Sequence, residues 1–407
     1  MPVVVFVLAA AVFAQGTSEF MLSGLLAPIA ADLGVSVGVA GLLTSVFAVG
    51  MVVGAPAMAM AVGAVPRRTA LIGFLGLFGA SHVFGALTPD FGPLLASRGV
   101  AAIANAGFLA ITLASLPALV PPAALGRATS VILSGVTLAC IVGVPAGTVL
   151  GQLLGWRAAF WAIAVLTAAA LVTLALLTRR TSRCLPCAPN RAHTRRARSA
   201  LDVSAEGPAR REWRTLRRAG LPVVITLGVL VNAATFAGFT YLGTLAGTLS
   251  GGFGVPVALA LFGVGSFAGV TLAGRYADRF GRRLLTLGLP VLAGVWLAAA
   301  LFAGRSLAGL LVFALVIGAS AFGIGSTLIA AIVRAASPDA PRIAGAVATT
   351  AFNVGAVIGP AAAGLVVHQA ALAPRAFWMG VAFTAVSAAL ALARPRALSG
   401  GEGARPL

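Results

Sequence analysis

Long apolar stretches, separated by short polar segments, run along most of this chain. A window of about 19 residues finds twelve stretches long enough for a helix to cross roughly 30 Å of hydrocarbon. They predict an all-α integral membrane protein with spans near 3–29, 39–63, 69–88, 93–117, 128–151, 157–178, 220–249, 255–275, 284–303, 307–333, 343–367 and 376–394.

The apolar pattern stops at Thr178 and resumes near Gly220, which divides the spans into two sets of six. We expect an N-terminal half at 1–178, a basic cytoplasmic linker at 179–219, a C-terminal half at 220–396 and a cytoplasmic tail at 397–407. A weak repeat at an offset of 215 residues supports this division: Phe47, Val49, Gly50 and Gly54 match Phe262, Val264, Gly265 and Gly269. Such a duplication is typical of transporters whose halves rock about a site near the midplane.

Composition and charge agree with a membrane location. The chain is 60% hydrophobic and 9% charged, which excludes an ordinary soluble domain. Its 28 basic residues are all Arg: 24 lie in one set of alternating loops and tails, Arg157, Arg305 and Arg375 lie in the other set, and Arg98 lies in or beside a span. The Arg-rich side should be cytoplasmic, with both termini inside. We therefore expect a multi-pass protein of the cell inner membrane, with a retained first span, whose charge faces lipid headgroups rather than nucleic acid.

One carboxylate, Glu19, lies at membrane depth in the first span. Gln15, Glu19 and Ser23 recur every four residues and share a helix face, which must point toward protein or water because a charge facing lipid is costly. A carboxyl in a cavity that is wet in one state and dry in another can exchange a proton near neutral pH. Glu19 is therefore predicted to couple transport to protons or to contact substrate. The alternative is a protonated Glu19 that only hydrogen-bonds a neighbouring helix.

Other polar residues within spans are candidates for the same cavity. Arg98, Asn105 and Thr112 are spaced by seven and share a face; Arg98 either interacts with Glu19 or reaches the outer interface. In the seventh span Asn232, Phe236 and Phe239 lie on one face with Thr235 and Gly243, and in the eleventh Asn353 shares a face with Thr349. Aromatic walls with a few polar groups suit a flat, amphipathic small molecule, although such a stripe is also compatible with helix packing.

Neither catalysis nor a cofactor is expected. His82 is interpreted as a packed residue or a helix-end contact, with a part in coupling as the alternative, and no acid near it or His368 in sequence suggests catalysis. Cys184, Cys187 and His193 leave a fourth zinc ligand unaccounted for, so no metal is predicted. A chain without Lys has no phosphate-binding loop of the usual type, so ATP is not expected to drive it.

The sharpest motif is the decamer from Gly274 to Arg283, between the eighth and ninth spans. It resembles the loop signature of the major facilitator superfamily, which implies a fold of two six-helix halves and a conformational latch formed by Gly274, Asp278, Arg279, Gly281, Arg282 and Arg283. The first-half copy departs from the signature, because Gly63 and Pro66 occupy the positions of Asp278 and Gly281. The resemblance therefore implies that the latch has moved to the second half.

Two further motifs resemble those of the same superfamily. The run from Arg98 to Gly107 is similar to its fourth-helix motif, which implies that Arg98 takes part in proton transfer. Gly143, Pro145, Gly147 and Gly151 resemble the glycine–proline motif of its antiporters and imply a hinge in the fifth span. Gly355, Gly359, Pro360 and Gly364 form a related pattern in the eleventh span.

The start of the chain narrows the resemblance. Gly16-Thr17-Ser18-Glu19-Phe20 and the segment from Ala31 to Ser36 resemble the drug:proton antiporters of this superfamily, especially bacterial chloramphenicol-resistance exporters. This implies export of chloramphenicol or related amphiphilic drugs in exchange for protons by alternating access, with the monomer as the working unit. The alternatives are export of sugars or other small metabolites and, from another class, a non-transporting membrane receptor or enzyme.

Overall fold

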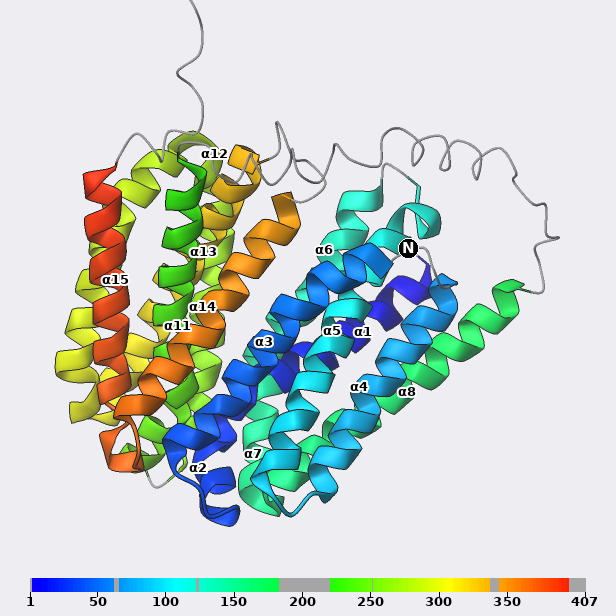
Figure 1. Cartoon of the computed structure of the whole chain (residues 1–407), viewed down its shortest axis with the longest axis horizontal. Coiled ribbons are helices and arrows are strands. Elements are labelled where there is room, and N and C mark those ends of the chain that lie inside the picture. The colour runs from blue at the N-terminus through cyan, green and yellow to red at the C-terminus, as the bar shows by residue number, and fades with distance from the viewer. Residues whose placement is uncertain are drawn as a thin grey trace, which may run out of the picture.

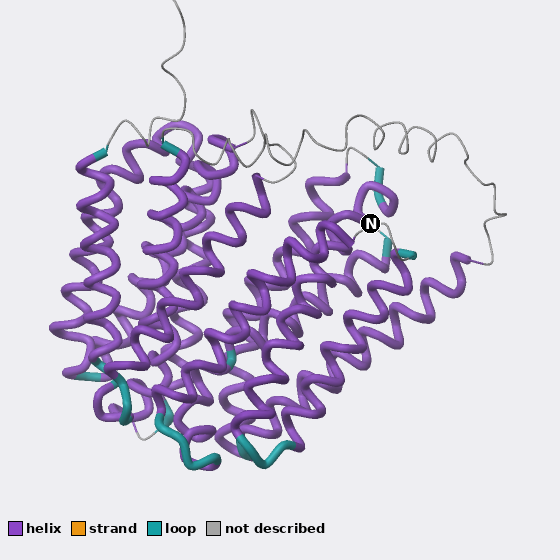
Figure 2. Tube along the Cα trace, in the orientation of Figure 1, coloured by secondary structure: helices purple, strands orange, loops and turns teal. Residues whose placement is uncertain are grey.

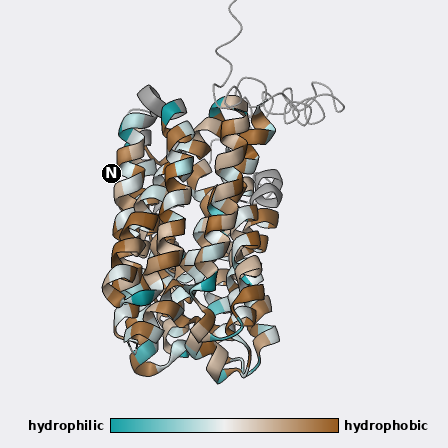
Figure 3. Ribbon diagram, turned by 90° about the vertical axis from the view of Figure 1, so that its left-hand side faces the viewer, coloured by the Kyte–Doolittle hydropathy of each residue, from teal (hydrophilic) through white to brown (hydrophobic). Residues whose placement is uncertain are grey.

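The computed structural model of the chain describes residues 2–61, 66–121, 124–182, 220–250, 252–336 and 344–394. Within these ranges it contains helices joined by short loops, and twelve segments are long and apolar enough to cross a membrane (Figures 1 and 2). Hydrophobic residues follow the helices along their length, as Figure 3 shows. The prediction of an all-α membrane protein with twelve spans is confirmed.

The helices form two bundles (Figure 1). The first bundle contains α1 (Val3–Phe20), α2 (Leu22–Asp32), α3 (Val37–Ala61), α4 (Arg67–Leu87), α5 (Phe91–Leu119), α6 (Leu125–Leu138), the π-helical segment η2 (Ala139–Gly143), α7 (Val144–Leu154) and α8 (Trp156–Ser182). The second bundle contains α11 (Leu221–Ser250), α12 (Gly254–Phe302), η3 (Ala303–Arg305), α13 (Leu307–Ala336), α14 (Ala344–Val366), η4 (Ala370–Leu372) and α15 (Arg375–Ala393). The exact boundaries of the two predicted halves stay a prediction, since most of the linker and the whole C-terminal tail lie outside the described residues.

Two predicted spans are not single regular helices. The first breaks at Met21, whose carbonyl accepts a hydrogen bond from the Gly24 N–H at 3.0 Å, a three-residue turn tighter than an α-helix. The fifth passes through η2, where the Val144 N–H reaches back to the Ala139 carbonyl. Pro145 follows at the start of α7, a position at which its missing N–H disturbs the backbone least. The predicted eighth and ninth spans both lie within α12.

The bundles contact each other near α2. Ser45 Oγ of α3 donates to the Val357 carbonyl of α14 at 3.0 Å, and Gln152 Nε2 of α7 donates to the Gly252 carbonyl at 2.8 Å. Gly38 lies directly against the Gly364 backbone, where a side chain would clash with the carbonyl. The end of α8 and the start of α11, which flank the Arg-rich segment, point away from α2 in Figure 1. These three contacts therefore lie toward the end of the bundles opposite the end of α8 and the start of α11.

Candidate proton-coupling and drug site

Glu19 lies one residue from the end of α1, where small residues bring that helix close to η2. Gly16 packs against Ala139, and a Cβ on Gly143 would come within 3.0 Å of the Thr17 Cβ. This close packing holds the last turn of α1 against the fifth span. Glu19 itself is partly buried and makes no ion pair or hydrogen bond with another described side chain.

Arg98 of α5 is 1% exposed and turns its guanidinium onto the residue before Glu19. One terminal nitrogen donates to Ser18 Oγ at 2.8 Å, and the other donates to the Ser18 carbonyl at 3.0 Å. The Phe47 ring lies beneath the guanidinium, with its centroid 4.6 Å from Arg98 Cζ. Arg98 therefore does not reach the outer interface, which removes that alternative. It lies close enough to Glu19 for their charges to interact, although the two side chains form no ion pair.

His82 of α4 completes this group and was undervalued by the sequence interpretation. It is buried and packed, with ring centroids 4.4 Å from Phe78 and 5.7 Å from Phe160, as expected for a packing residue. Its Nε2 atom also lies 2.6 Å from Ser18 Oγ and 3.4 Å from Arg98. The available signal was weak: a Ser beside the buried acid and a second titratable side chain in an apolar span.

The remaining polar candidates of the first bundle are buried as well. Both amide atoms of Gln15, Ser23 Oγ and Thr112 Oγ1 are buried without a hydrogen-bond partner among the described residues. Asn105 donates only a long contact of 3.6 Å to the Met51 sulfur. Buried polar atoms are normally hydrogen-bonded, so these groups mark places where water or a polar ligand would be favoured.

Aromatic residues join Glu19 to the second bundle. Phe20, its neighbour on α1, packs against both Phe236 and Phe239 of α11, with ring centroids 6.1 Å and 5.9 Å away. The stripe continues to Phe262 of α12, 4.7 Å from Phe239. The predicted aromatic face of the seventh span is thus brought beside the acid. Phe20 was not predicted to be part of it.

The side chains of the two Asn candidates of the second bundle donate hydrogen bonds to backbone carbonyls of the helices. Asn232 donates to the Phe352 carbonyl of α14 at 2.5 Å, and Asn353 donates to the Thr349 carbonyl one turn back in its own helix. These bonds fix the direction of both side chains. Their predicted contact with substrate is untested by this geometry.

The structure describes the whole of the predicted hinge but only part of the predicted latch. Gly143 ends η2, while Gly147 faces Met21 and Gly151 faces Leu25, so the glycines of the predicted hinge line the contact with α1 and α2. Of the latch residues, Gly274 and Arg283 are exposed. The side chains of Asp278, Arg279 and Arg282, with Gly281, lie outside the described residues, so the latch stays a prediction.

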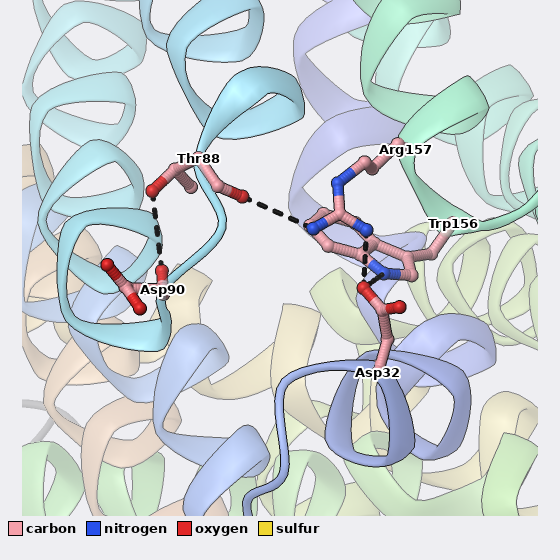
Figure 4. Close-up of polar contacts among 5 residues, drawn as sticks. All are labelled: Asp32, Thr88, Asp90, Trp156 and Arg157. Carbon is pink, nitrogen blue, oxygen red and sulfur yellow. Dashed lines mark hydrogen bonds and ion pairs between the residues drawn. The ribbon is translucent and has the colours of Figure 1, made fainter.

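A second polar cluster, at the end of the first bundle near α2, was missed (Figure 4). Asp32 of α2 forms an ion pair with Arg157 of α8 and accepts a hydrogen bond from Trp156 Nε1 at 3.0 Å. Arg157 also donates to the Thr88 carbonyl at 3.3 Å. Hydrogen bonds from Arg157 and Trp156 lower the pKa of the Asp32 carboxyl. The cluster ties three helix ends together and is partly open to water, as suits a structural contact.

No metal site is formed by the side chains that the structure describes, where no group of three potential ligands occurs. Cys184, Cys187 and His193 lie outside the described residues. The described site therefore consists of one acid, one guanidinium, one imidazole, several hydroxyls and amides, and an aromatic wall.

Comparison with known proteins gives consistent results. The sequence profile of the Major Facilitator Superfamily matches residues 8–272 and 231–407. A "Chloramphenicol resistance protein" from Streptomyces lividans is 48% identical over 364 residues, covering 88% of both chains. A "Chloramphenicol efflux pump" from Mycobacterium tuberculosis is 30% identical over 413 residues, covering 98% of this chain and 94% of the relative. An "Inner membrane transport protein YdhP" from Escherichia coli is 32% identical over 88% of this chain and 87% of the relative.

A solved structure supports the fold independently. A bacterial homologue of the human lysosomal transporter Spinster, in an inward-facing and occupied conformation, superposes with a TM-score of 0.76 and covers 97% of this chain and 96% of its own. At 17% sequence identity this likeness shows the architecture alone.

Proposed function

The chain belongs to the major facilitator superfamily and is a multi-pass membrane transporter rather than an enzyme, and on that premise we propose that it exports chloramphenicol or related amphiphilic drugs in exchange for protons. Two relatives that are named for chloramphenicol resistance or efflux support this cargo, and both align with most of this chain. The alternative of sugar or metabolite export has no specific feature of the described site in its favour.

The observation that carries the proposed mechanism is the position of Glu19. The acid sits between a buried guanidinium on one side and, through Phe20, an aromatic wall on the other. A proton on Glu19 removes the charge beside that wall, whereas an ionised Glu19 restores it. In the proposed exchange, drug and proton bind to this site alternately, the drug while Glu19 is ionised and the proton after the drug has left.

Alternating access follows from the arrangement of the bundles. We place the Arg-rich segment and both termini in the cytoplasm of the inner membrane, according to the distribution of Arg. On this placement the contacts near α2 lie on the outer side, which supports an inward-facing arrangement of the bundles. Drug enters from the cytoplasm, the monomer rocks about the midplane, and a proton from outside displaces the drug. Asp278 latches the opposite, outward-open state in this mechanism.

The test is accumulation of labelled chloramphenicol in cells that express the protein, with and without a protonophore. We expect low accumulation that rises when the proton gradient collapses. In Glu19→Gln the rate of uphill export should fall by roughly tenfold or more, which corresponds to a typical coupling free energy. Downhill drug exchange should persist. Asp32→Asn, a carboxylate outside the proposed cavity, is the matched control. Uphill export by Glu19→Gln with the wild-type dependence on the gradient would contradict the role of this acid.

A further inference from the structure

Three side chains from three helices form one hydrogen-bonded chain in the first bundle. Arg98 of α5 donates to Ser18 Oγ of α1, and Ser18 Oγ lies 2.6 Å from His82 Nε2 of α4. The other imidazole nitrogen, Nδ1, lies 2.7 Å from the Phe78 carbonyl one turn back in α4. All three residues are fully or almost fully buried, so water does not determine the direction of these bonds.

The direction of each bond follows from the chemistry of its two ends. A carbonyl oxygen only accepts, so His82 Nδ1 carries a proton and donates to Phe78. Arg98 only donates, so Ser18 Oγ accepts from it and has its own proton to give. A neutral His82 accepts that proton at Nε2, so the Ser18 hydroxyl and both imidazole nitrogens are satisfied, while Arg98 Nε has no hydrogen-bond partner among the described residues. A second proton on His82 would leave Ser18 facing two donors and would place a cation 3.4 Å from Arg98.

This arrangement holds Arg98 away from the acid beside it. Both terminal nitrogens of the guanidinium bind Ser18, through its hydroxyl and its carbonyl, and none of the described ion pairs joins Arg98 to Glu19. Ser18 and Glu19 are consecutive residues of α1, so a small movement of that helix or of the guanidinium exchanges one partner for the other. Arg98 therefore has two alternative partners at adjacent positions of α1.

We propose that Ser18 and His82 form a dock that holds Arg98 off Glu19, and that His82 is a positioning residue which keeps the Ser18 hydroxyl turned as a donor to it and an acceptor for Arg98. This inference deepens the proposed proton exchange and rests on it. While Arg98 is docked, Glu19 lacks its counter-ion and keeps a proton more readily. When Arg98 moves to Glu19, the acid is stabilised as a carboxylate and the proton leaves.

No other described charge competes for this position. The helices that pack around His82 are α1, α5 and α8, and their nearby charged groups are Glu19 and Arg98. Arg157, also on α8, is engaged by Asp32 at the end of the bundle near α2. The His82 ring is otherwise enclosed by Phe78 and Phe160. If a substitution of His82 changes the pH dependence of exchange, it should therefore do so by altering the interaction between Arg98 and Glu19.

The decisive measurement is the infrared titration of the Glu19 carboxyl in purified protein without drug, since a protonated carboxyl absorbs apart from a carboxylate. The Glu19→Gln variant identifies the band. His82→Phe keeps a ring of similar size but removes the acceptor, which frees Arg98. We expect the midpoint of the Glu19 band to move by about one pH unit or more toward lower pH, the usual effect of an opposite charge close by.

Two variants separate the dock from ring packing. His82→Gln can place an acceptor near the position of Nε2 and should restore the midpoint toward wild type, whereas His368→Phe, at an exposed histidine, should leave it unchanged. Ser18→Ala, the smallest change in the dock, should also move the midpoint of the Glu19 band to lower pH. It provides the test if His82→Phe does not fold. An unmoved midpoint in the folded dock variants, or equal shifts for His82→Gln and His82→Phe, would overturn the proposal.

The outcome of the drug assay is independent of the outcome of the carboxyl titration. Proton release on adding chloramphenicol to wild-type proteoliposomes tests the proposed function, while the carboxyl titration needs no drug. A wild-type protein that releases no protons, yet shows the shifted band in His82→Phe, would overturn the cargo and leave the dock standing. Proton release by wild type together with an unshifted band in His82→Phe would support the cargo and overturn the dock.

Discussion

The two bundles place very different side chains at junctions of three helices. In the first, α1, α4 and α8 meet around His82, which is held by Ser18 and Phe160. In the second, α11, α12 and α15 meet around Trp296, which lies against Gly238, Gly380 and Phe377. The repeat offset of 215 residues takes His82 to Leu297, the neighbour of Trp296. The junction in the first bundle is thus hydrogen-bonded, while the one in the second is formed mainly by apolar surfaces and leaves Trp296 Nε1 without a hydrogen-bond partner among the described residues.

This difference indicates that the two bundles have different roles in the transport cycle. A polar junction is stable only while each donor has an acceptor, so its partners are specific and can be exchanged when a proton arrives. The junction around Trp296 depends mainly on shape, and the flat indole packed beside two glycines leaves little room for rearrangement. The first bundle therefore has the features of a switch, and the second those of a fixed frame that presents an aromatic wall.

The largest expected effect is on stability, from the apolar junction. Trp296→Ala empties a fully buried site and should lower the free energy of unfolding by about 3–5 kcal/mol. Thermal unfolding in detergent measures this loss. If the second bundle is a frame, the protein that remains folded should keep the wild-type pH dependence of drug exchange. A changed pH profile at unchanged stability would contradict this difference in roles.

A smaller effect is expected from the polar junction. Arg98→Lys keeps the charge but cannot give the hydroxyl and carbonyl of Ser18 two separate nitrogens. A hydrogen bond to a charged group contributes about 1.5–3 kcal/mol, so proton-coupled exchange should fall roughly tenfold or more. Exchange assays in proteoliposomes at several pH values measure it.

Arg157→Lys is the matched control for that substitution. Arg157 also bridges two acceptors, Asp32 and the Thr88 carbonyl, but it does so in partial contact with water and away from Glu19. Its replacement should leave the pH dependence of exchange unchanged. Equal losses in both Lys variants would show that the buried position of Arg98 has no special role.

The sequence was sufficient for the parts of this comparison that depend on hydrophobicity. The length of the apolar stretches predicted twelve membrane helices, and a lone acid at membrane depth made Glu19 the first candidate for the site. The dock could not be predicted, because Ser18, His82 and Arg98 come from separate helices whose rotation about their axes is set by packing. The π-helical turn before Pro145 was also missed, since it depends on how α1 and α12 press against η2.

A further contrast lies within the first bundle, between the buried Arg98 and the partly exposed pair of Asp32 and Arg157. Because solvent screens the exposed pair, Asp32→Asn should lower the free energy of unfolding at neutral pH by only about 1 kcal/mol or less. The folded state lowers the pKa of Asp32, so this contribution is present above the unfolded value of about 4 and is lost as pH falls through the folded value. Unfolding midpoints of both proteins, measured from neutral to acid pH, should therefore converge.

Asp90→Asn is the control for this last effect. Asp90 lies at the start of α5, exposed, and among the described residues its carboxylate has no ion pair. The substitution should change the unfolding midpoint less than Asp32→Asn does, and added salt should narrow the remaining difference. A deficit of Asp32→Asn that persists in acid would mean that packing of α2 on α8, and not the ion pair, stabilises this end of the bundle. The charge of Asp32 would then be dispensable, unlike that of Arg98.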